Sequence, residues 1–315
     1  MTDQDAPAWR SPIVTPGLYE GIGMEHYHGP VEICPGPSIS SSGLRTIEDK
    51  SPFHYWYDSP LNPDRPEREE KAHFVFGRLV HELLEKGEKC WPGWHITPPG
   101  FSDAHVKKWE VAIAERDAAK LCGKACVPHG DAMKAMAMVA AVHAHPRASL
   151  MFKSGIFEPT LAWKDKETGI WLRVRPDYFP NLRKWIPDYK TTASAHPDDF
   201  AKSVVNFGYH MAAALYLDGI DELFGERPSG FMFVAQEKTE PFVTELFQLD
   251  EEAIGWGRVL NRRSLRRFAK CLEDDKWPTY GNDVNLVTLP DWTRRQLELR
   301  TQTYELDVPT FTQQK

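Results

Sequence analysis

The chain has 315 residues and a net charge of −7, and 41% of its residues are hydrophobic and 12% aromatic. This composition excludes a disordered protein, and the acidic balance argues against one that coats nucleic acid non-specifically through a basic face. No apolar run is long enough to cross a bilayer, and five irregularly spaced cysteines argue against a disulfide framework. We therefore expect a cytoplasmic protein without a membrane partner.

Residues 1–38 are rich in proline and glycine and show no hydrophobic periodicity. We expect an extended arm there, with one short strand at about 17–22. Three serines at 40–42 are typical helix N-caps, and they predict a helix over 43–48.

The clearest helix signal covers residues 71–86. Its apolar side chains recur at the spacing of one buried helix face: Phe76, Leu79, Val80, Leu83 and Leu84. Similar but weaker signals predict further helices that begin at Ser51-Pro52 or lie at about 102–121, 131–145, 197–204, 209–224 and 250–274.

The pattern changes after residue 157 to short apolar runs separated by turn residues, which is typical of strands. The strands are expected at 158–163, 171–178, 184–191, 230–236 and 242–248. Strands placed among helices in this order favour one α/β domain whose mixed central sheet is flanked by helices. We place this domain at 39–275, followed by a tail at 276–315 that packs on it.

The candidate site consists of Asp177, Asp188 and Lys190. Side chains two apart on a strand point to one face, so Asp188 and Lys190 should project together. A neighbouring strand would bring Asp177 toward Asp188 across the ladder. Converging carboxylates suit a hard cation such as Mg²⁺, with Mn²⁺ as a substitute, and an adjacent ammonium group suits phosphodiester hydrolysis.

A simpler interpretation of these residues is a surface hairpin with an Asp–Lys ion pair. The apolar residues Trp185 and Ile186 argue against it, because the charged residues that follow them would then be partly buried. Buried charges are usually paired or bound to a metal.

Seven stretches form an ordered set over most of residues 16–245: PGLYEGIGMEHYH, SISSSGLRTIEDKSPFHYWYDSP, FGRLVHELLEKG, EPTLAWKDKETGIWLRVRPDYF, IPDYKTTASAHPDDF, FGYHMAAALYLDGI and FMFVAQEKTEPF. With this set the chain resembles the PD-(D/E)XK nuclease superfamily. More narrowly, it resembles the RecE (exonuclease VIII) type of phage and prophage recombination exonuclease. The resemblance implies a restriction-endonuclease-like core with helical elaboration on its N-terminal side.

The resemblance implies a role for each matching residue. Asp177 matches the first metal-binding aspartate, Asp188 matches the acidic ligand of the D-X-K motif, and Lys190 matches the catalytic lysine. Glu158 matches an acidic position of the catalytic and metal site on the preceding strand, and His81 matches a helix histidine beside the metal. From the residues alone, His81 equally fits a half-buried histidine, and Glu158 equally fits a solvated strand end.

Related nucleases carry a Gln-x-x-x-Tyr pattern on the helix after the D-X-K strand. Tyr216 matches the tyrosine, but Ala212 stands where the glutamine would be, which leaves the details of DNA contact open. Tyr209 and His210, one turn earlier, could compensate in DNA binding, or they could simply begin a helix that packs on the sheet.

Arg173 and Arg175 alternate along the strand that leads to Asp177, so they could share its face and contact phosphate. The alternative is cross-strand pairing with acids such as Asp165. A basic run on the last long helix could follow a DNA backbone or form a solvated helix face: Arg262, Arg263, Arg266, Arg267 and Lys270.

By resemblance, we expect Mg²⁺-dependent hydrolysis of double-stranded DNA from its ends, in the 5′-to-3′ direction, for homologous recombination. The resemblance further implies a homo-oligomer, a RecT-type annealing protein as partner, and a bacterial or phage-infected host cell. Two alternatives remain open. One is a catalytically weak DNA-end-binding protein on a nuclease fold, and the other is an endonuclease of the same superfamily.

Overall fold

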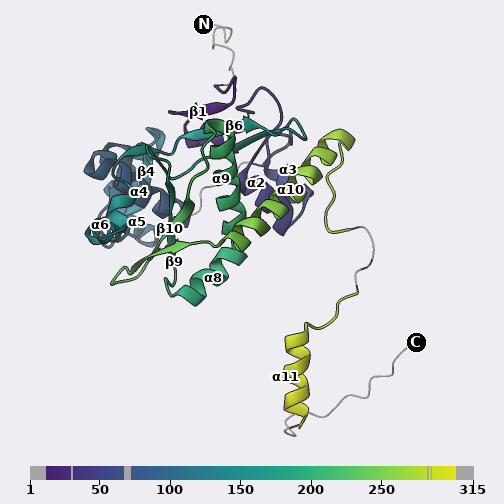
Figure 1. The fold of residues 1–315 in the computed structure, drawn as a ribbon. Coiled ribbons are helices and arrows are strands. Elements are labelled where there is room, and N and C mark those ends of the chain that lie inside the picture. Colours follow the sequence, from purple (N-terminus) through teal and green to yellow (C-terminus); the bar gives the residue numbers. More distant parts are fainter. Residues whose placement is uncertain (1–11, 30, 67–71, 282–283, 285, 303–315) are drawn as a thin grey trace. The chain divides into compact units, whose positions relative to one another are not determined.

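The computed structural model describes residues 12–29, 31–66, 72–281, 284 and 286–302. The chain forms two units, Met1–Thr279 and Tyr280–Lys315, and every strand of the described residues belongs to the first (Figure 1). The second unit carries the helix α11 (Asp291–Gln302). Parts of the predicted arm and tail, and the first residue of the helix expected at 71–86, lie outside the described residues, so the division into arm, domain and tail stays a prediction.

The first sheet contains four strands in the order β1-β6-β7-β2. Their bounds are Gly17–Tyr19 (β1), Thr160–Lys164 (β6), Trp171–Val174 (β7) and Ser38–Ser40 (β2). β2 runs parallel to β7, whereas the other neighbours are antiparallel. Both outer strands come from the N-terminal 40 residues, so this part of the chain completes the sheet.

The second sheet has the order β11-β10-β9. Its strands are Thr244–Gln248 (β11), Gly230–Glu237 (β10) and Trp185–Thr192 (β9). β9 and β10 are parallel and β10 and β11 antiparallel, which confirms a mixed sheet. Two short pairs complete the strands, β3 (Trp94–Thr97) with β4 (Ala125–Pro128), and β5 (Gly155–Phe157) with β8 (Tyr178–Pro180).

One face of the strands is covered by α2, α9 and α10, which pack on one another. The bounds on this side are Ser41–Asp49 (α2), Pro52–Asp58 (α3), Pro197–Asn206 (α8), Tyr209–Phe224 (α9) and Glu251–Asp274 (α10). Ile186 of β9 and Phe233 of β10 face this side and belong to the core beneath α9. The capping prediction for α2 is confirmed, because the Ser40 hydroxyl accepts the Gly43 N–H.

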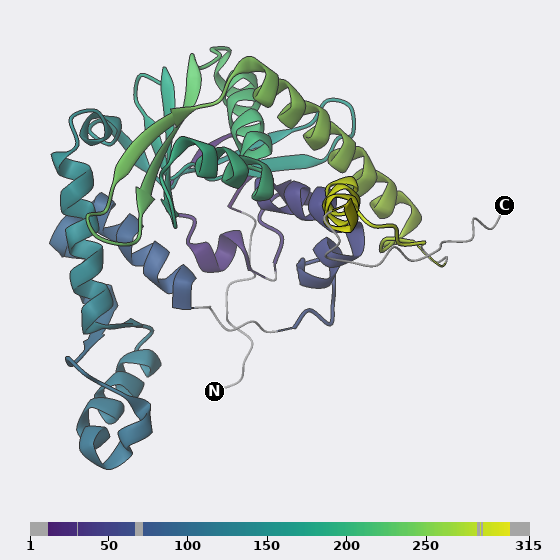
Figure 2. The same ribbon diagram turned by 90° about the horizontal axis from the view of Figure 1, so that it is seen from below.

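The other face is covered by α4 (Ala72–Lys86) and α6 (His129–Ala144). Tyr189 and Val234 point to this side, in the two-residue alternation of a strand. The predicted stripe from Phe76 to Leu84 is confirmed, since it lies in this second core. Figure 2 shows the two helix groups on opposite sides of the strands. The remaining helices of this unit are α5 (Val106–Leu121), the short α1 (Met24–Tyr27) and α7 (Ala148–Met151), and the 3₁₀ helices Gly87–Gly93 and Asp103–His105.

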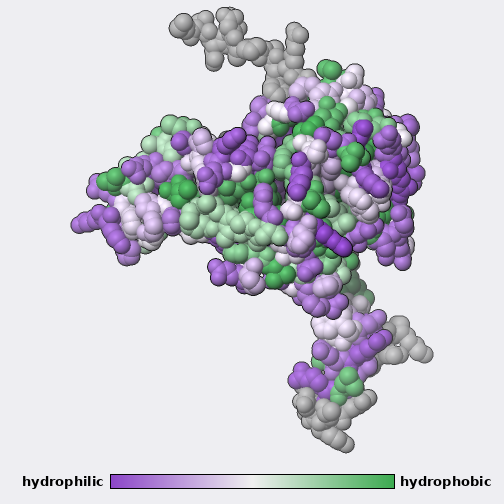
Figure 3. All heavy atoms as spheres, turned by 60° about the vertical axis from the view of Figure 1, so that its left-hand side comes forward, coloured by the Kyte–Doolittle hydropathy of each residue, from purple (hydrophilic) through white to green (hydrophobic). Residues whose placement is uncertain are grey.

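The predicted α/β fold class is therefore present, with mixed sheets flanked by helices, although the strands form two larger sheets rather than one. Polar and apolar side chains are interspersed over the face in Figure 3. Within the described part of the chain, no helix combines the length and the apolar character needed to cross a membrane.

Candidate active site

Asp188 and Lys190 project from the same face of β9, toward the side that α9 covers. Asp188 is 6% exposed and Lys190 is half-buried, and the Lys190 ammonium group pairs with Oδ2 of Asp188. Tyr189 between them points to the opposite core. The alternation predicted from the D-X-K spacing is therefore present.

Asp177 reaches the same place from a break between two strands. β7 ends at Val174 and β8 begins at Tyr178, so the continuous strand expected over 171–178 is wrong. Pro176 explains the break, because proline has no N–H to donate to a ladder. Oδ2 of Asp177 instead accepts the N–H of Tyr189 at 2.8 Å and lies 3.8 Å from Nζ of Lys190.

The charges of this triad strongly affect one another. Burial raises the pKa of Asp188 to about 6; Lys190 opposes this shift, and Asp177 adds to it. Burial alone would lower the pKa of Lys190, but the two carboxylates outweigh it and raise that pKa. Two acids thus share one ammonium group, and the ionised triad keeps a net negative charge that favours a further cation.

His81 and Glu158 both lie beside Asp177. Nδ1 of His81 is 3.9 Å from Oδ1 of Asp177, and its ring meets the Tyr189 ring edge-on at 5.3 Å. Glu158 donates its backbone N–H to the Asp177 carbonyl at 3.2 Å. Burial raises the pKa of Glu158, with His81 lowering it and Asp177 raising it further.

The expected strand at 158–163 begins two residues later than predicted, at Thr160. Glu158 lies in the turn before it, with a left-handed backbone at φ 47°. Pro159, which cannot donate to a ladder, separates this turn from the strand.

The donor set fits magnesium in part. Among the described residues, no three His, Cys, Asp or Glu side chains converge as a ready-made metal cage. Mg²⁺ does not require one, because it usually takes one or two carboxylates and keeps several waters. Oδ2 of Asp188 is buried without a hydrogen-bond partner of regular geometry and faces Lys190. Asp177 and Asp188 therefore fit such an ion, while ligand roles for His81 and Glu158 stay predictions.

Comparison with known families gives one match, over residues 40–290, to a PDDEXK-like domain of unknown function (DUF3799). The chain belongs to this family. A search of the curated proteins gave no match.

Two solved structures are similar to this PDDEXK-like chain. A candidate exonuclease from Eubacterium rectale is 15% identical with a TM-score of 0.55, over 82% of this chain and 92% of that one. A phage-related exonuclease from Haemophilus somnus 129PT is 14% identical with a TM-score of 0.27, over 62% of this chain and 95% of that one. The first likeness supports the shared fold.

Arg173 and Arg175, expected to contact DNA, are instead engaged with the N-terminal segment of the chain, before the matched PDDEXK-like domain. Arg173 is buried, and its guanidinium donates to the Ser38 hydroxyl at 2.8 Å and to the Tyr27 carbonyl. Arg175 donates to Thr160 Oγ1 at 3.0 Å and to the Ile22 carbonyl, and both cations lie over the Tyr27 ring. The prediction of phosphate contact is wrong for Arg173, because its side chain is buried. For Arg175, the contacts favour a structural role.

Tyr216 and Tyr209 of α9 occupy different surroundings. The Tyr216 hydroxyl donates to the Arg175 carbonyl at 2.8 Å, so it supports the segment that leads to Asp177 rather than facing outward. Tyr209 lies directly beside the site, because Nζ of Lys190 is 5.6 Å from its ring centroid. The half-buried Ala212 brings no polar side chain to the site.

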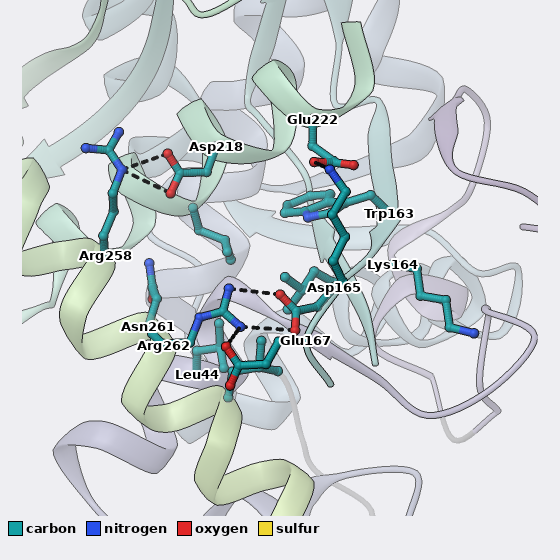
Figure 4. Close-up of a pocket in the computed structure, with 14 residues that line it drawn as sticks. Leu44, Trp163, Lys164, Asp165, Glu167, Asp218, Glu222, Arg258, Asn261 and Arg262 are labelled. Atoms are coloured by element: carbon teal, nitrogen blue, oxygen red, sulfur yellow. Dashed lines mark hydrogen bonds and ion pairs between the residues drawn. The ribbon is translucent and has the colours of Figure 1, made fainter. Parts of the chain in front are cut away.

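The basic run on α10 forms ion pairs, which favours the solvated-face alternative over a DNA track. Arg262 pairs with Asp165 at 2.9 Å and Arg266 with Glu167 at 2.6 Å. Arg262 also lines a cavity of about 270 Å³ between α9, α10 and the β6–β7 hairpin (Figure 4). Ion pairs such as Arg258–Asp218 and Lys166–Glu222 form between residues that line this cavity, and none of the lining residues belongs to the triad.

Sequence reasoning missed Gln236 of β10, which is fully buried. Its Oε1 accepts the Tyr189 hydroxyl, and its Nε2 donates to the Met138 carbonyl at 2.9 Å. These two hydrogen bonds fix the side chain of Tyr189, which stands between Asp188 and Lys190 in the sequence. The sequence signal for Gln236 is that it is the one amide side chain in the apolar run of β10. An amide is costly to bury without hydrogen-bond partners, so a partner such as Tyr189 is expected.

Proposed function

We propose that this PDDEXK-like chain is a Mg²⁺-dependent DNA exonuclease that hydrolyses phosphodiesters from double-stranded ends. The observation that carries the proposal is the convergence of Asp177, Asp188 and Lys190 where β9 meets the break between β7 and β8. The fold supports a nuclease, and this triad supplies the groups that phosphodiester hydrolysis needs.

Each side chain has a distinct task in this proposal. Asp177 and Asp188 would hold the ion, and the Tyr189 N–H keeps the Asp177 carboxylate turned toward β9. Bound Mg²⁺ would polarise the phosphate and lower the pKa of a water. Lys190 would orient the attacking water and stabilise negative charge that develops on the phosphate. Tyr216 would keep the segment before Asp177 in place.

The finer parts of the proposal rest on the resemblance to RecE-type exonucleases. They are the 5′-to-3′ direction, a role in recombination with a RecT-type partner, a homo-oligomer, and Mn²⁺ as a substitute metal. Ala212 stands where related nucleases carry a glutamine, and this favours a second candidate function, that of a DNA-end-binding protein with little catalytic power.

A cleavage assay on linear and covalently closed circular duplex DNA tests the proposal. We expect the wild type to degrade the linear DNA with Mg²⁺ and to spare the circle. Lys190→Ala should lower the rate about 100-fold or more, since removing one group that stabilises transition-state charge typically costs this much. Lys184→Ala, at an exposed lysine just before β9, is the matched control and should cleave normally.

Equal cleavage by wild type and Lys190→Ala, or cleavage without any divalent ion, would contradict the proposal. Metal-independent binding of DNA ends without cleavage would support the accessory protein, and loss of the circle would support an endonuclease. Labels on the 5′ and 3′ ends determine the direction.

A further inference from the structure

Three aromatic rings form a continuous stack from the core to the surface beside the candidate site. Phe233 of β10 is fully buried, and its ring stacks on Tyr209 at 5.5 Å with an interplanar angle of 29°. Tyr209 in turn meets Phe207 at 5.5 Å and 32°. Phe207 ends the stack at the surface, where it is 56% exposed.

The turn between α8 and α9 fixes the outer ring. Gly208 has a left-handed backbone at φ 61°, and a Cβ there would lie 2.9 Å from Cδ of Arg45. The Arg45 guanidinium donates to the Phe207 carbonyl at 2.7 Å. The exposed ring is thus held by a constrained turn on one side and by Tyr209 on the other, so little order has to be gained when it binds a flat ligand.

The position of the stack indicates what that ligand is. Nζ of Lys190 lies 5.6 Å from the centroid of Tyr209, and the ring of Phe207 contacts the same tyrosine with 5.5 Å between the two ring centroids. Because Lys190 and Phe207 contact the same tyrosine ring, the base of a nucleotide whose phosphate lies beside Lys190, or the base next to it, would be within reach of Phe207. Exposed aromatic rings stack on nucleobases of any sequence, and each stacked base contributes about 1–3 kcal/mol to binding.

We infer that Phe207 is the stacking platform for the terminal base of a DNA end, with Tyr209 as its support. The inference rests on the proposed function, because it names the part of the substrate that this site holds.

The test uses the full chain and a blunt duplex with 2-aminopurine at its 5′ end, in Ca²⁺ so that binding is measured without cleavage. We expect wild type to quench the fluorescence on binding. Phe207→Ala should bind about 5- to 100-fold more weakly without quenching, and Phe207→Trp should restore both. Tyr57→Ala is the matched control, because Tyr57 is another exposed aromatic, 46% exposed, on α3, which packs on α2 and α10.

Unchanged affinity and quenching in Phe207→Ala would overturn the inference. A change of oligomeric state in that variant at unchanged DNA affinity would also overturn it and would assign Phe207 to contacts between copies of the chain. Wild type that cleaves with Mg²⁺ but never quenches contradicts the inference alone. Wild type that quenches but never cleaves contradicts the proposed nuclease and leaves the platform standing.

Discussion

At the scale of single residues, Asp188 decides how the site responds to protons and cations. Its pKa of about 6 lies above the usual value of 3.8, so between about pH 4 and 6 the folded protein binds more protons than the unfolded chain. Asp188 therefore destabilises the metal-free protein as the pH rises through this window. A bound cation would reverse that effect, because it competes with the proton for the same carboxylate.

We predict that Mg²⁺ raises the thermal unfolding temperature at pH 7.5 and has almost no effect at pH 5. Thermal unfolding with and without Mg²⁺ at the two pH values measures this difference. Asp188→Asn should remove the stabilisation at pH 7.5, because the amide does not replace the charged ligand. Equal stabilisation at both pH values would show that the ion binds elsewhere.

Tyr216 tests whether support of the Asp177 segment matters for catalysis. Tyr216→Phe removes the hydrogen bond to the Arg175 carbonyl, which is 2.8 Å long, and leaves the ring packed on Phe231. We expect a loss of about 0.5–1.5 kcal/mol in stability and a fall in kcat larger than any change in KM. Urea unfolding and steady-state cleavage measure the two effects. Tyr216→Phe cleaving at the wild-type rate would limit the tyrosine to a structural role.

At the scale of elements, the close packing of α9 against α10 fixes the position of the first turn of α9. Tyr209 is the first residue of that turn, so its position is fixed as well. A Cβ on Gly257 of α10 would lie 2.2 Å from the His210 carbonyl oxygen, so the two helices approach through a bare backbone. Backbone atoms cannot move aside as a flexible side chain can. The position of Tyr209 beside Lys190 therefore depends on a glycine in another helix.

We predict that Gly257→Ala lowers the free energy of unfolding by about 1–3 kcal/mol, the usual range for overpacking. Gly255→Ala, two residues earlier on the same helix, has open space around its added Cβ and should be neutral or stabilising by up to about 1 kcal/mol. Chemical denaturation of both variants provides the comparison. Equal stabilities would contradict the close approach of the two helices.

Sequence patterns predicted elements whose period is strong and local. The stripe from Phe76 to Leu84 and the alternation of Asp188 with Lys190 depend on neighbouring residues alone, so they could be predicted from the sequence. The strands β3 and β4 were missed, since each has four residues and pairs with a distant partner.

The site was predictable in its chemistry and less so in its surroundings. Convergence of Asp177 with β9 was expected, but its position in a strand break depends on Pro176 and on a hydrogen bond from Tyr189. Arg173 was predicted to contact phosphate from the two-residue alternation of its strand. That alternation carries no information about the N-terminal segment that covers this side chain. Phe207 was missed, because its contact with Tyr209, whose ring also lies beside Lys190, arises only when α8, α9 and β9 come together.

At the scale of the whole molecule, the site belongs to the first of the two units. The triad and its hydrogen-bond partners all lie before Thr279, within the unit that contains both larger sheets. We predict that a chain ending at Thr279 unfolds cooperatively and keeps its cleavage rate within about tenfold. Circular dichroism and the linear-duplex assay measure these properties. A folded but inactive truncated chain would assign a catalytic or DNA-binding part to residues 280–315.

The most direct test of the account is a crystal structure of the protein soaked in Mn²⁺, with the ion located by its anomalous scattering. We expect one ion bound by carboxylate oxygens of both Asp177 and Asp188 at about 2.0–2.6 Å, with Lys190 displaced from between them. An ion bound away from these two residues, or none at a saturating concentration, would contradict the proposed metal centre.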